Sequence, residues 1–591
     1  MPWVVAGLTF LAFVPALESL FVNWDDQANF LENPDFRGLG MKELGWMFST
    51  FHLAHYQPVT WLSWALDKAL WGTNPFGYHL TNLLLHCGMA ALFYLVCRRF
   101  LDRGAPESAG IHPWAAAWAA LFFAVHPLRV EAVAWATERR ELLSGLLYLW
   151  AVVLYLKRHQ EGAGRQPSLW RVTGVGALAM LSNVRSVSLP VALLVLDYYP
   201  LDRLRLHAGG SRLGLVKEKL PLFGLALGAG LLGLLAQFTT YTLIPMAKAG
   251  LPARLEQTCF GVAFYLWKTL APWGLSNWYG DSYMAPRTWL VAAGALAAVL
   301  LTLWLAWRGM AGRGRVLFAA WLWYLVTLSP TLGLVKSGRQ IVADRYSYLP
   351  SLALALLCAA GLAKLRAKTR QGRGPVFVAA AACALAVLPL LGSLTWRQCR
   401  VWNDTVSLWS RAVSVDPRSV FIRTNHGIAL LQARRFDEAV RAFESIREDT
   451  VDGMDPDSGV AFFGFIRFLT AMTHHNWGVD LMYRDRPLEA EEHLRKSLFY
   501  NPDLESGRTA LGLALLRSGK LDAAIPLLQE AMEAAPDAVD PRLNLAQALA
   551  AKGRKKEALA QYEAALKLSP GDPGVLEARA RLLDAGRKGP R

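Results

Sequence analysis

Long apolar runs constrain this chain most, because a helix of about 20 apolar residues is long enough to cross a membrane. Eleven runs of about 15 to 21 residues recur before residue 395. They lie near 3–21, 77–97, 112–128, 141–156, 168–182, 186–200, 221–238, 288–306, 316–331, 347–363 and 376–394. The sequence therefore predicts an all-α fold, with a polytopic bundle of about eleven transmembrane helices over residues 1–396.

The loops between these runs alternate in character. Five short loops are rich in Lys and Arg, and they begin at Cys97, Lys157, Asp202, Arg308 and Lys364. The positive-inside rule places basic loops in the cytoplasm. The longer, aromatic and acidic loops at 22–76, 126–140, 239–287 and 332–346 then face outward, provided that the weakly apolar stretch 259–272 does not cross. This count places the chain after Trp396 on the outer side.

Composition excludes several other classes. Hydrophobic residues make up 54% of the 591 residues and charged residues 18%. The formal net charge of +16 lies largely in short loops, where it sets membrane orientation, so we expect no nucleic-acid partner. The six cysteines form no CxxC pair, so we expect neither a disulfide framework nor a metal site, and no cofactor.

The last third of the chain repeats with a period of 34 residues. The repeat is marked by Pro502, Pro536 and Pro570, by Gly519 and Gly553, and by Ala490, Ala524 and Ala558. A 34-residue period with small residues at fixed positions is typical of tetratricopeptide repeats, in which paired helices stack into a solenoid. About 17 extra residues interrupt the array between Ala439 and Ala490. We predict an outer tetratricopeptide domain over 397–585 whose concave face binds a protein segment.

Two adjacent carboxylates, Asp25 and Asp26, open the first outer loop directly after the first apolar run. One interpretation is a solvated edge that keeps the helix from sliding into lipid. The other is chemistry, because the same loop carries His52, His55 and several tryptophans. A carboxylate can accept a proton from a hydroxyl, and aromatic rings such as Trp24, Trp46, Trp61 and Trp64 can stack on sugar faces.

The second and third candidate groups are richer in arginine. The second outer loop carries His126, Arg129, Glu131, Glu138, Arg139, Arg140 and Glu141. Arg139 and Glu141 could simply extend from the start of the next helix, but an arginine cluster also suits phosphate, whose oxygens match the guanidinium fork. The third group is Asp344, Arg345 and Tyr346, which read either as a helix cap or as a phosphate site at the membrane surface. Arg185, which lies between two apolar runs, is a weaker candidate for binding phosphate.

These blocks together resemble a known family. The segments FVNWDDQANFLENPDFRGL, HPLRVEAVAWATERRELLSGLLYL and ADRYSYLP, followed by tetratricopeptides, are similar to the transmembrane and tetratricopeptide-repeat-containing proteins and their bacterial relatives. The resemblance implies the C-type glycosyltransferase superfold, a polyprenyl-phosphate sugar donor, protein O-mannosylation and an acidic signature pair, here Asp25 and Asp26. Bacterial relatives often carry Lys in the block where this chain has Asn183, with Arg185 two residues on.

The resulting hypothesis is a membrane transferase that moves a sugar, such as mannose, to a protein hydroxyl by inverting transfer. Asp25 or Asp26 acts as the base, and His126, Glu131, Arg139, Arg140, Asp344, Arg345 and Tyr346 bind the donor phosphate and substrate. The resemblance places such a protein in a bacterial inner membrane, with the repeats in the periplasm. The rival hypothesis is a non-catalytic membrane scaffold that displays tetratricopeptides. A transporter would favour ionisable residues in mid-span, whereas most charges here lie at span ends.

Overall fold

The computed structural model describes residues 1–104, 106–159, 167–203, 212–311, 314–368, 374–446 and 456–587. Within these ranges the regular elements are helices, and a single isolated β-bridge joins Leu243 and Ser337. The chain divides into two compact units, Met1–Ser419 and Val420–Arg591. Large parts of the predicted basic loops after Lys157, Asp202 and Lys364, and of the predicted interruption of the repeats, lie outside the described residues.

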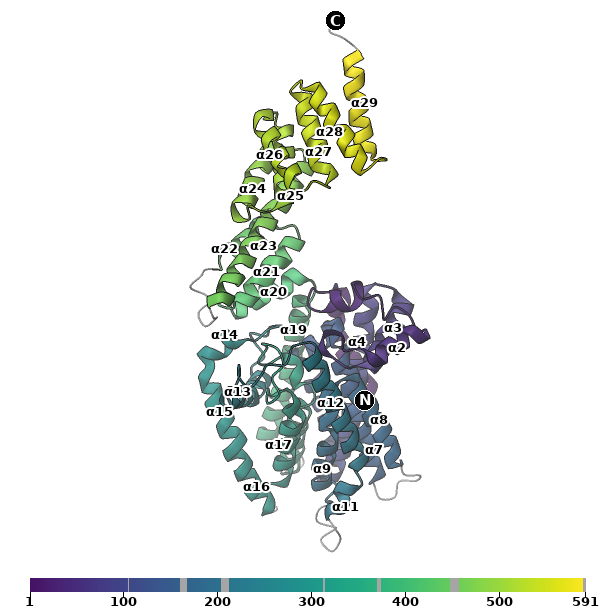
Figure 1. Cartoon of the computed structure of the whole chain (residues 1–591). Coiled ribbons are helices and arrows are strands. Elements are labelled where there is room, and N and C mark those ends of the chain that lie inside the picture. Colours follow the sequence, from purple (N-terminus) through teal and green to yellow (C-terminus); the bar gives the residue numbers. More distant parts are fainter. Residues whose placement is uncertain are drawn as a thin grey trace. The chain divides into compact units, whose positions relative to one another are not determined.

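Helices of very different length make up the first unit (Figure 1). They are α1 Pro2–Phe13, α2 Met41–Ser49, α3 Pro58–Trp71, α4 Pro75–Gly104, α5 His112–Ala124, α6 Val130–Ala134, α7 Arg139–Arg158, α8 Leu169–Ser182, α9 Leu189–Tyr198, α11 Arg212–Lys217, α12 Leu220–Thr239, α13 Leu251–Leu270, α14 Asp281–Met284, α15 Thr288–Leu296, α16 Thr302–Met310, α17 Arg315–Leu328, α18 Ser351–Lys368, α19 Pro375–Val401 and α20 Thr405–Val415. A π-helical turn, η9 Ala297–Leu301, joins α15 to α16.

Four helices in the described part of this unit are long and apolar enough to cross a membrane: Pro75–Arg103, Leu220–Thr239, Asp281–Met310 and Pro375–Val401. A fifth candidate is bent by 55° between Ala109–Ala124 and Pro127–Ala134. The eleven predicted runs all contain helix, but the other runs are shorter, broken or charged. The structure thus gives an all-helical fold with membrane helices, and by length and composition it supports four or five spans.

Several of the shorter helices end in tight 3-10 turns. The turns η5 Pro127–Arg129, η6 Ala136–Glu138, η7 Val184–Ser188 and η11 Asp344–Ser347 follow or precede an apolar helix. Such turns leave backbone and side-chain polar groups free to bond elsewhere, and buried ones need partners. Three of the four turns carry residues of the candidate site.

The stretch 259–272, predicted not to cross, lies mostly in the 20-residue helix α13. This helix is not among those long and apolar enough to span, and it packs closely on α15. At the contact, a Cβ added to Gly294 would lie 1.7 Å from the carbonyl oxygen of Cys259. The two backbones therefore approach closely because residue 294 has no side chain.

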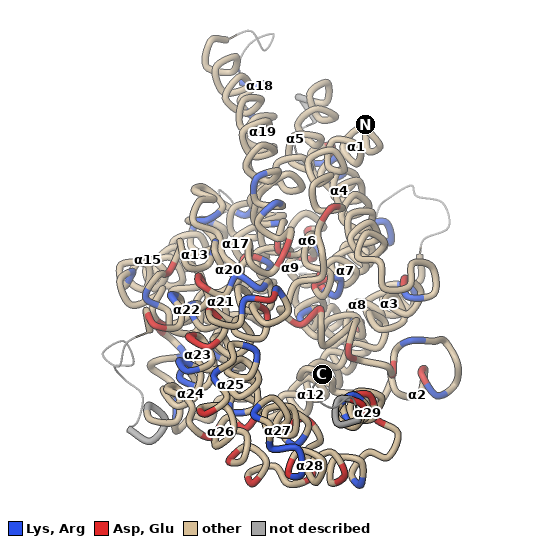
Figure 2. Tube along the Cα trace, turned by 90° about the horizontal axis from the view of Figure 1, so that it is seen from above, with Lys and Arg blue, Asp and Glu red and all other residues tan. Residues whose placement is uncertain are grey.

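The second unit is built from helix pairs. They are α21 Val420–Gln432 with α22 Phe436–Glu444, α23 Pro456–Tyr483 with α24 Pro487–Tyr500, α25 Glu505–Arg517 with α26 Leu521–Ala534, and α27 Val539–Ala551 with α28 Lys555–Leu568, followed by α29 Pro573–Arg587. Ala490, Ala524 and Ala558 are fully buried, as their 34-residue spacing predicts. In Figure 2, α27 and α28 carry interspersed positive and negative residues, whereas α18 of the first unit is largely uncharged.

The short helix α20 belongs to the first unit, although the tetratricopeptide domain was predicted to start at 397. Its Trp409 ring lies 5.2 Å from the ring of Trp24, and Ser282 donates a 2.5 Å hydrogen bond to Asp416. These contacts bind the segment after α19 to the first unit. The second unit then begins at Val420.

Candidate functional site

The two adjacent carboxylates of the first loop lie in different environments. Asp26 is fully buried and accepts three hydrogen bonds, from the backbone N–H of Val22 at 3.1 Å and from the N–H and hydroxyl of Thr137 at 3.0 and 2.7 Å. Burial raises the pKa of Asp26 to about 7, although these three donors lower it. Asp26 therefore joins the loop after α1 to the turn that precedes α7.

Asp25 is half-buried and points elsewhere. Its φ of 71° is in the left-handed region, which is uncommon for a residue other than Gly, Asn or Asp. Its carboxylate makes no hydrogen bond or ion pair with another described residue. Burial raises the pKa of Asp25, and the charges of Arg140 and Arg345 partly oppose that rise. Asp25 therefore carries a carboxylate without a hydrogen-bond partner among the described residues, close enough to Arg140 and Arg345 for their charges to act on it.

Glu138 is the centre of that cluster. Arg140 donates to one oxygen of Glu138 from Nε at 3.1 Å and from Nη2 at 2.5 Å, and Nε of Arg345 lies 3.2 Å from the same oxygen. The other oxygen lies 3.9 Å from Nη1 of Arg185. Burial opposes ionisation, but these arginines outweigh it and lower the pKa of Glu138 to about 2. Glu138 is therefore an anion that orients three guanidinium groups.

Two further glutamates, Glu131 and Glu141, bind the other two arginines of the cluster. Glu131 binds the guanidinium of Arg345 and also accepts its backbone N–H at 2.8 Å. Glu141 accepts from Arg185 at 2.7 Å and from the amide of Asn183 at 3.1 Å. Because three glutamates match three arginines, the cluster offers fixed N–H donors rather than a strong net positive field.

Aromatic rings flank the arginines. The ring of Tyr346 lies 4.2 Å from the guanidinium carbon of Arg185 and 5.0 Å from that of Arg345. The Trp135 ring lies 5.2 Å from Arg345, and its indole N–H donates to the backbone carbonyl of Trp24 at 2.8 Å. Cation–π contacts of this kind hold guanidinium planes in place.

His55 lies beside the same charges. Its imidazole makes no hydrogen bond with another described residue and is half-buried. Burial lowers the pKa of His55 well below its usual range, and nearby Arg140 lowers it further. A neutral imidazole therefore faces the cluster at neutral pH.

Arg139 does not join the cluster, although it is adjacent to Arg140 in the sequence. Its guanidinium points into the fold, pairs with Asp67, and donates to Asn82 at 2.9 Å and to the carbonyls of Tyr78 and Ser63 at 2.8 and 3.2 Å. The side chain is fully buried. Arg139 thus connects α7 to α3 and α4, and its donors are already engaged.

His126 and Asp344 also have partners within the fold. Nε2 of His126 lies 3.1 Å from the carbonyl of Thr269, and its Nδ1 accepts the backbone N–H of Leu128 at 3.2 Å. Tyr279 donates to the Asp344 carboxylate at 2.9 Å. Burial, followed by the charge of Glu131, raises the pKa of Asp344 to about 8. These two residues support the walls of the site.

The tryptophans of the first loop are mostly core residues. Trp61 and Trp64 are fully buried, 4.8 Å apart between ring centres, and pack with Phe30 and Phe36. Trp46 packs on Trp61 at 4.8 Å. Because their faces are covered by other rings, these side chains stabilise the loop and do not offer a sugar platform.

Across the part of the chain that the structure describes, no group of three or more His, Cys, Asp or Glu side chains is placed to hold a metal ion. The site consists instead of carboxylates, guanidinium groups and one imidazole. Glu138, Glu141, Arg185 and His55 are central in space; the sequence offered each as a candidate, but none was assigned as the base or to donor binding. The signal for the first three was present, since all are charges beside an apolar helix.

The site and fold define a protein with membrane helices, a buried polar cluster and tetratricopeptide repeats. The family model described as tetratricopeptide repeat matches residues 509–573. The chain is similar to curated relatives that are named protein O-mannosyl-transferases. The Drosophila melanogaster protein Tmtc3 is 28% identical over 480 residues, covering 70% of this chain and 51% of the relative.

Two mammalian relatives have comparable similarity. TMTC3 of Mus musculus is 25% identical over 89% of this chain and 55% of the relative, and TMTC1 of Homo sapiens is 25% identical over 74% and 54%. The chain therefore spans about half the length of the curated relatives that it matches. Among solved structures, the tetratricopeptide protein YrrB matches 30% of this chain and 82% of its own at 19% identity, with a TM-score of 0.23. That match does not bear on the site.

Proposed function

We propose that this protein is a membrane glycosyltransferase that transfers a sugar, such as mannose, from a polyprenyl-phosphate donor to a protein hydroxyl. The observation that carries the proposal is the Asp25 carboxylate, which has no hydrogen-bond partner among the described residues and lies near enough to Arg140 and Arg345 for their charges to lower its pKa. The names of the curated relatives support the reaction class. A carboxylate without a structural partner is suited to proton transfer.

In the proposed reaction Asp25 is the base. The acceptor hydroxyl gives its proton to the Asp25 carboxylate while its oxygen forms a bond to the anomeric carbon of the sugar. The bond between that carbon and the phosphate oxygen breaks, and the electron pair leaves with the polyprenyl phosphate. A single displacement inverts the configuration at the anomeric carbon. Asp26, with three hydrogen bonds, positions the loop that carries the base.

The departing phosphate needs N–H donors rather than a general acid. Arg140 and Arg185 are the best placed for this role, because each uses only part of its guanidinium on a glutamate. Glu138 and Glu141 fix the direction of the remaining N–H groups, so little reorganisation is needed as charge develops. Arg345, which binds Glu131 and Glu138, and Tyr346 complete the wall around them.

The membrane arrangement belongs to the same proposal. We infer that the shorter and broken helices also cross, which gives about eleven spans in a C-type glycosyltransferase arrangement. The chain would start in the cytoplasm of a bacterial cell, and the site and the repeats would face the periplasm across the inner membrane. The basic loops support this orientation through the positive-inside rule. We propose no cofactor beyond the lipid-linked donor.

The tetratricopeptide unit would hold the protein acceptor. Stacked helix pairs present a continuous surface to an extended or helical segment, which suits delivery of a hydroxyl side chain. The rival function is a non-catalytic membrane scaffold that uses the same repeats for protein contacts. A scaffold has no need for a carboxylate held in a left-handed conformation beside arginines.

Reconstituted transfer tests the proposal directly. The purified full chain in liposomes is given labelled polyprenyl-phosphate mannose and a mixture of periplasmic proteins. We expect label on protein hydroxyls, and inverted configuration in the released sugar. If folded protein transfers no label from any polyprenyl-phosphate sugar, the scaffold function is the correct one.

The pH dependence of transfer reports on Asp25. A base acts only when deprotonated, so the rate should fall tenfold per pH unit below the pKa of Asp25, which burial raises. Arg140 lowers this pKa, so Arg140→Gln should move the acid limb to higher pH. The matched control is Arg339→Gln, an exposed arginine of the 332–346 loop, which should leave the limb in place. If the acid side of the pH–rate profile is unchanged in Arg140→Gln, Asp25 is not the base.

A further inference from the structure

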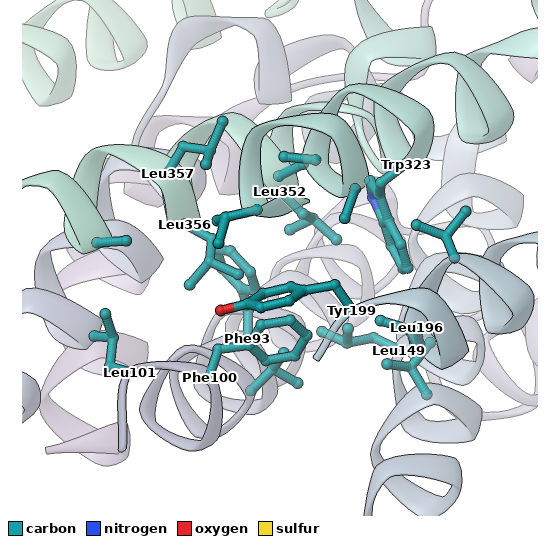
Figure 3. Close-up of a pocket in the computed structure, with 18 of the residues that line it drawn as sticks. Phe93, Phe100, Leu101, Leu149, Leu196, Tyr199, Trp323, Leu352, Leu356 and Leu357 are labelled. Carbon is teal, nitrogen blue, oxygen red and sulfur yellow. The ribbon is translucent and has the colours of Figure 1, made fainter. Parts of the chain in front are cut away.

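An apolar pocket lies within the first unit, between helices α4, α7, α9, α17 and α18. Its free space is about 970 Å³, counting the open mouth. Figure 3 shows the ring of Tyr199 among Phe93, Phe100 and Leu356, with Trp323 and Leu352 farther along the wall. The lining is apolar except for the Tyr199 hydroxyl and Lys364.

The pocket runs along one helix from a buried end to an exposed end. Leu352 is 3% exposed and Trp323 is 8% exposed, whereas Lys364 is exposed and Phe100 and Leu356 are half-buried. From Leu352 to Lys364 is twelve residues of α18, which is about 18 Å at 1.5 Å per residue. One leaflet of a bilayer has about 15 Å of hydrocarbon. The pocket is therefore about as long as the hydrocarbon of one leaflet.

This pocket is separate from the candidate site. Helix α7 meets the site at Arg140 and Glu141, and reaches the pocket at Leu149 and Val152, about 12 to 18 Å farther along. Nothing in the proposed transfer uses this end of the helices. Water gains no hydrogen bonds in an apolar cavity, so the occupant that suits this pocket is a hydrocarbon chain.

The lining includes one charged residue, Lys364. Lys364 lines the pocket and forms no ion pair with a described residue, and Arg99 precedes Phe100 of the lining. Arg315, next to Val316, is already paired with Asp202 at 2.6 Å. An ammonium group at the end of an apolar pocket fits an anionic headgroup above a hydrocarbon chain.

We propose that this pocket holds one hydrocarbon chain of an anionic membrane phospholipid, with the phosphate of that lipid at Lys364. The chain would fill the space from the mouth to Trp323. The indole N–H of Trp323 donates to the carbonyl of Leu349 at 3.2 Å, and Leu349 follows the segment that carries Arg345 and Tyr346. A bound lipid would therefore stabilise the start of α18 and, through it, one wall of the site.

The test is lipid binding to the purified, delipidated full chain in detergent. Phosphatidylglycerol or phosphatidylcholine is added, and bound lipid is counted by native mass spectrometry while the unfolding temperature is recorded. We expect one tightly bound phosphatidylglycerol per chain, a rise in unfolding temperature with lipid concentration, and weaker binding of phosphatidylcholine.

Variants locate the binding. Ala353→Trp should fill the inner end and Leu356→Trp the half-buried part, and each should weaken binding at least tenfold; the second serves if the first does not fold. Lys364→Glu should weaken the binding of phosphatidylglycerol about tenfold. The matched controls are Ala382→Trp on exposed α19 and Lys368→Glu one turn beyond Lys364, and both should bind as the wild type does.

Three results would overturn the proposal. The first is undiminished binding in folded Ala353→Trp and Leu356→Trp variants. The second is equal affinity for phosphatidylcholine, which would remove the role of Lys364. The third is displacement of phosphatidylglycerol by a polyprenyl phosphate at equal concentration, which would assign the pocket to the donor. None of these measurements depends on sugar transfer, so the outcome is independent of the proposed function.

Discussion

Asp25→Asn is expected to lower sugar transfer by about 10²- to 10⁴-fold, the usual contribution of a general base, and to leave the unfolding temperature unchanged. Asparagine has nearly the same shape as aspartate and tolerates the left-handed backbone at this position, where φ is 71°. It cannot accept the proton of the acceptor hydroxyl. The measurement is the initial rate of label transfer in liposomes, with a thermal unfolding curve on the same preparation.

The neighbouring carboxylate should behave differently. In Asp26→Asn an amide NH₂ group replaces one carboxylate oxygen. It then opposes at least one of the groups that donate to Asp26, which are the backbone N–H of Val22 and the N–H and hydroxyl of Thr137. A buried donor without an acceptor costs about 1–3 kcal/mol, so this variant should unfold at lower temperature. The matched control is Asp35→Asn, an exposed carboxylate of the same loop, which should change neither rate nor stability.

This pair of variants separates the two carboxylates. If Asp25→Asn retains transfer while folded Asp26→Asn loses it at a temperature far below unfolding, Asp26 is the base. Retained transfer in both variants would remove the acidic pair from the mechanism. Loss of folding in Asp25→Asn would show that its carboxylate stabilises the loop.

Arg139→Leu is expected to reduce the free energy of unfolding by about 3–5 kcal/mol, the cost of leaving a buried charge unpaired. The charge is that of Asp67, which is 3% exposed and pairs with Arg139. Asn82 and the carbonyls of Tyr78 and Ser63 lose donors in the same change. Chemical unfolding of the detergent-solubilised chain, followed by tryptophan fluorescence, measures the loss.

A double variant shows whether the pair itself is responsible. Replacing a buried ion pair by apolar residues is often neutral, so Arg139→Leu with Asp67→Leu should recover much of the stability. If Arg139→Leu is as stable as the wild type and instead transfers sugar slowly, the residue acts on the donor. In that case the phosphate interpretation drawn from the sequence is right and the structural role is wrong.

The sequence located the region of the site but could not assign roles within it. The Asp25–Asp26 pair, the arginine-rich loop before α7 and the Asp344–Arg345 segment were all predicted as site segments, and the structure brings parts of all three together at Glu138 and Glu131. His126, Asp344 and Arg139 engage partners within the fold instead. Arg185 enters the site from the turn η7, and His55 from the loop that also carries Asp25.

The number of membrane-crossing helices is a second feature that the sequence alone did not determine. Apolar runs predict helix well, and all eleven contain helix. The number that cross stays a prediction, because in the described part of the chain four or five helices have the length and composition to span, and the other runs form shorter, broken or charged helices. In such a bundle the neighbouring helices satisfy the polar turns, and a sequence window contains no information on neighbours.

By itself, the sequence determined the repeat unit, the helical content and the segments that carry charge beside apolar helices. Those features are periodic or local, so a window of one chain contains them. Only the tertiary structure decided which of two adjacent residues faces the site. Arg139 and Arg140 open the same helix, where neighbouring side chains point about 100° apart, so one enters the core and the other reaches Glu138. Asp25 and Asp26 also differ: three donors hold the Asp26 carboxylate in the core, while Asp25, with a left-handed backbone, has no hydrogen-bond partner among the described residues and lies near Arg140 and Arg345.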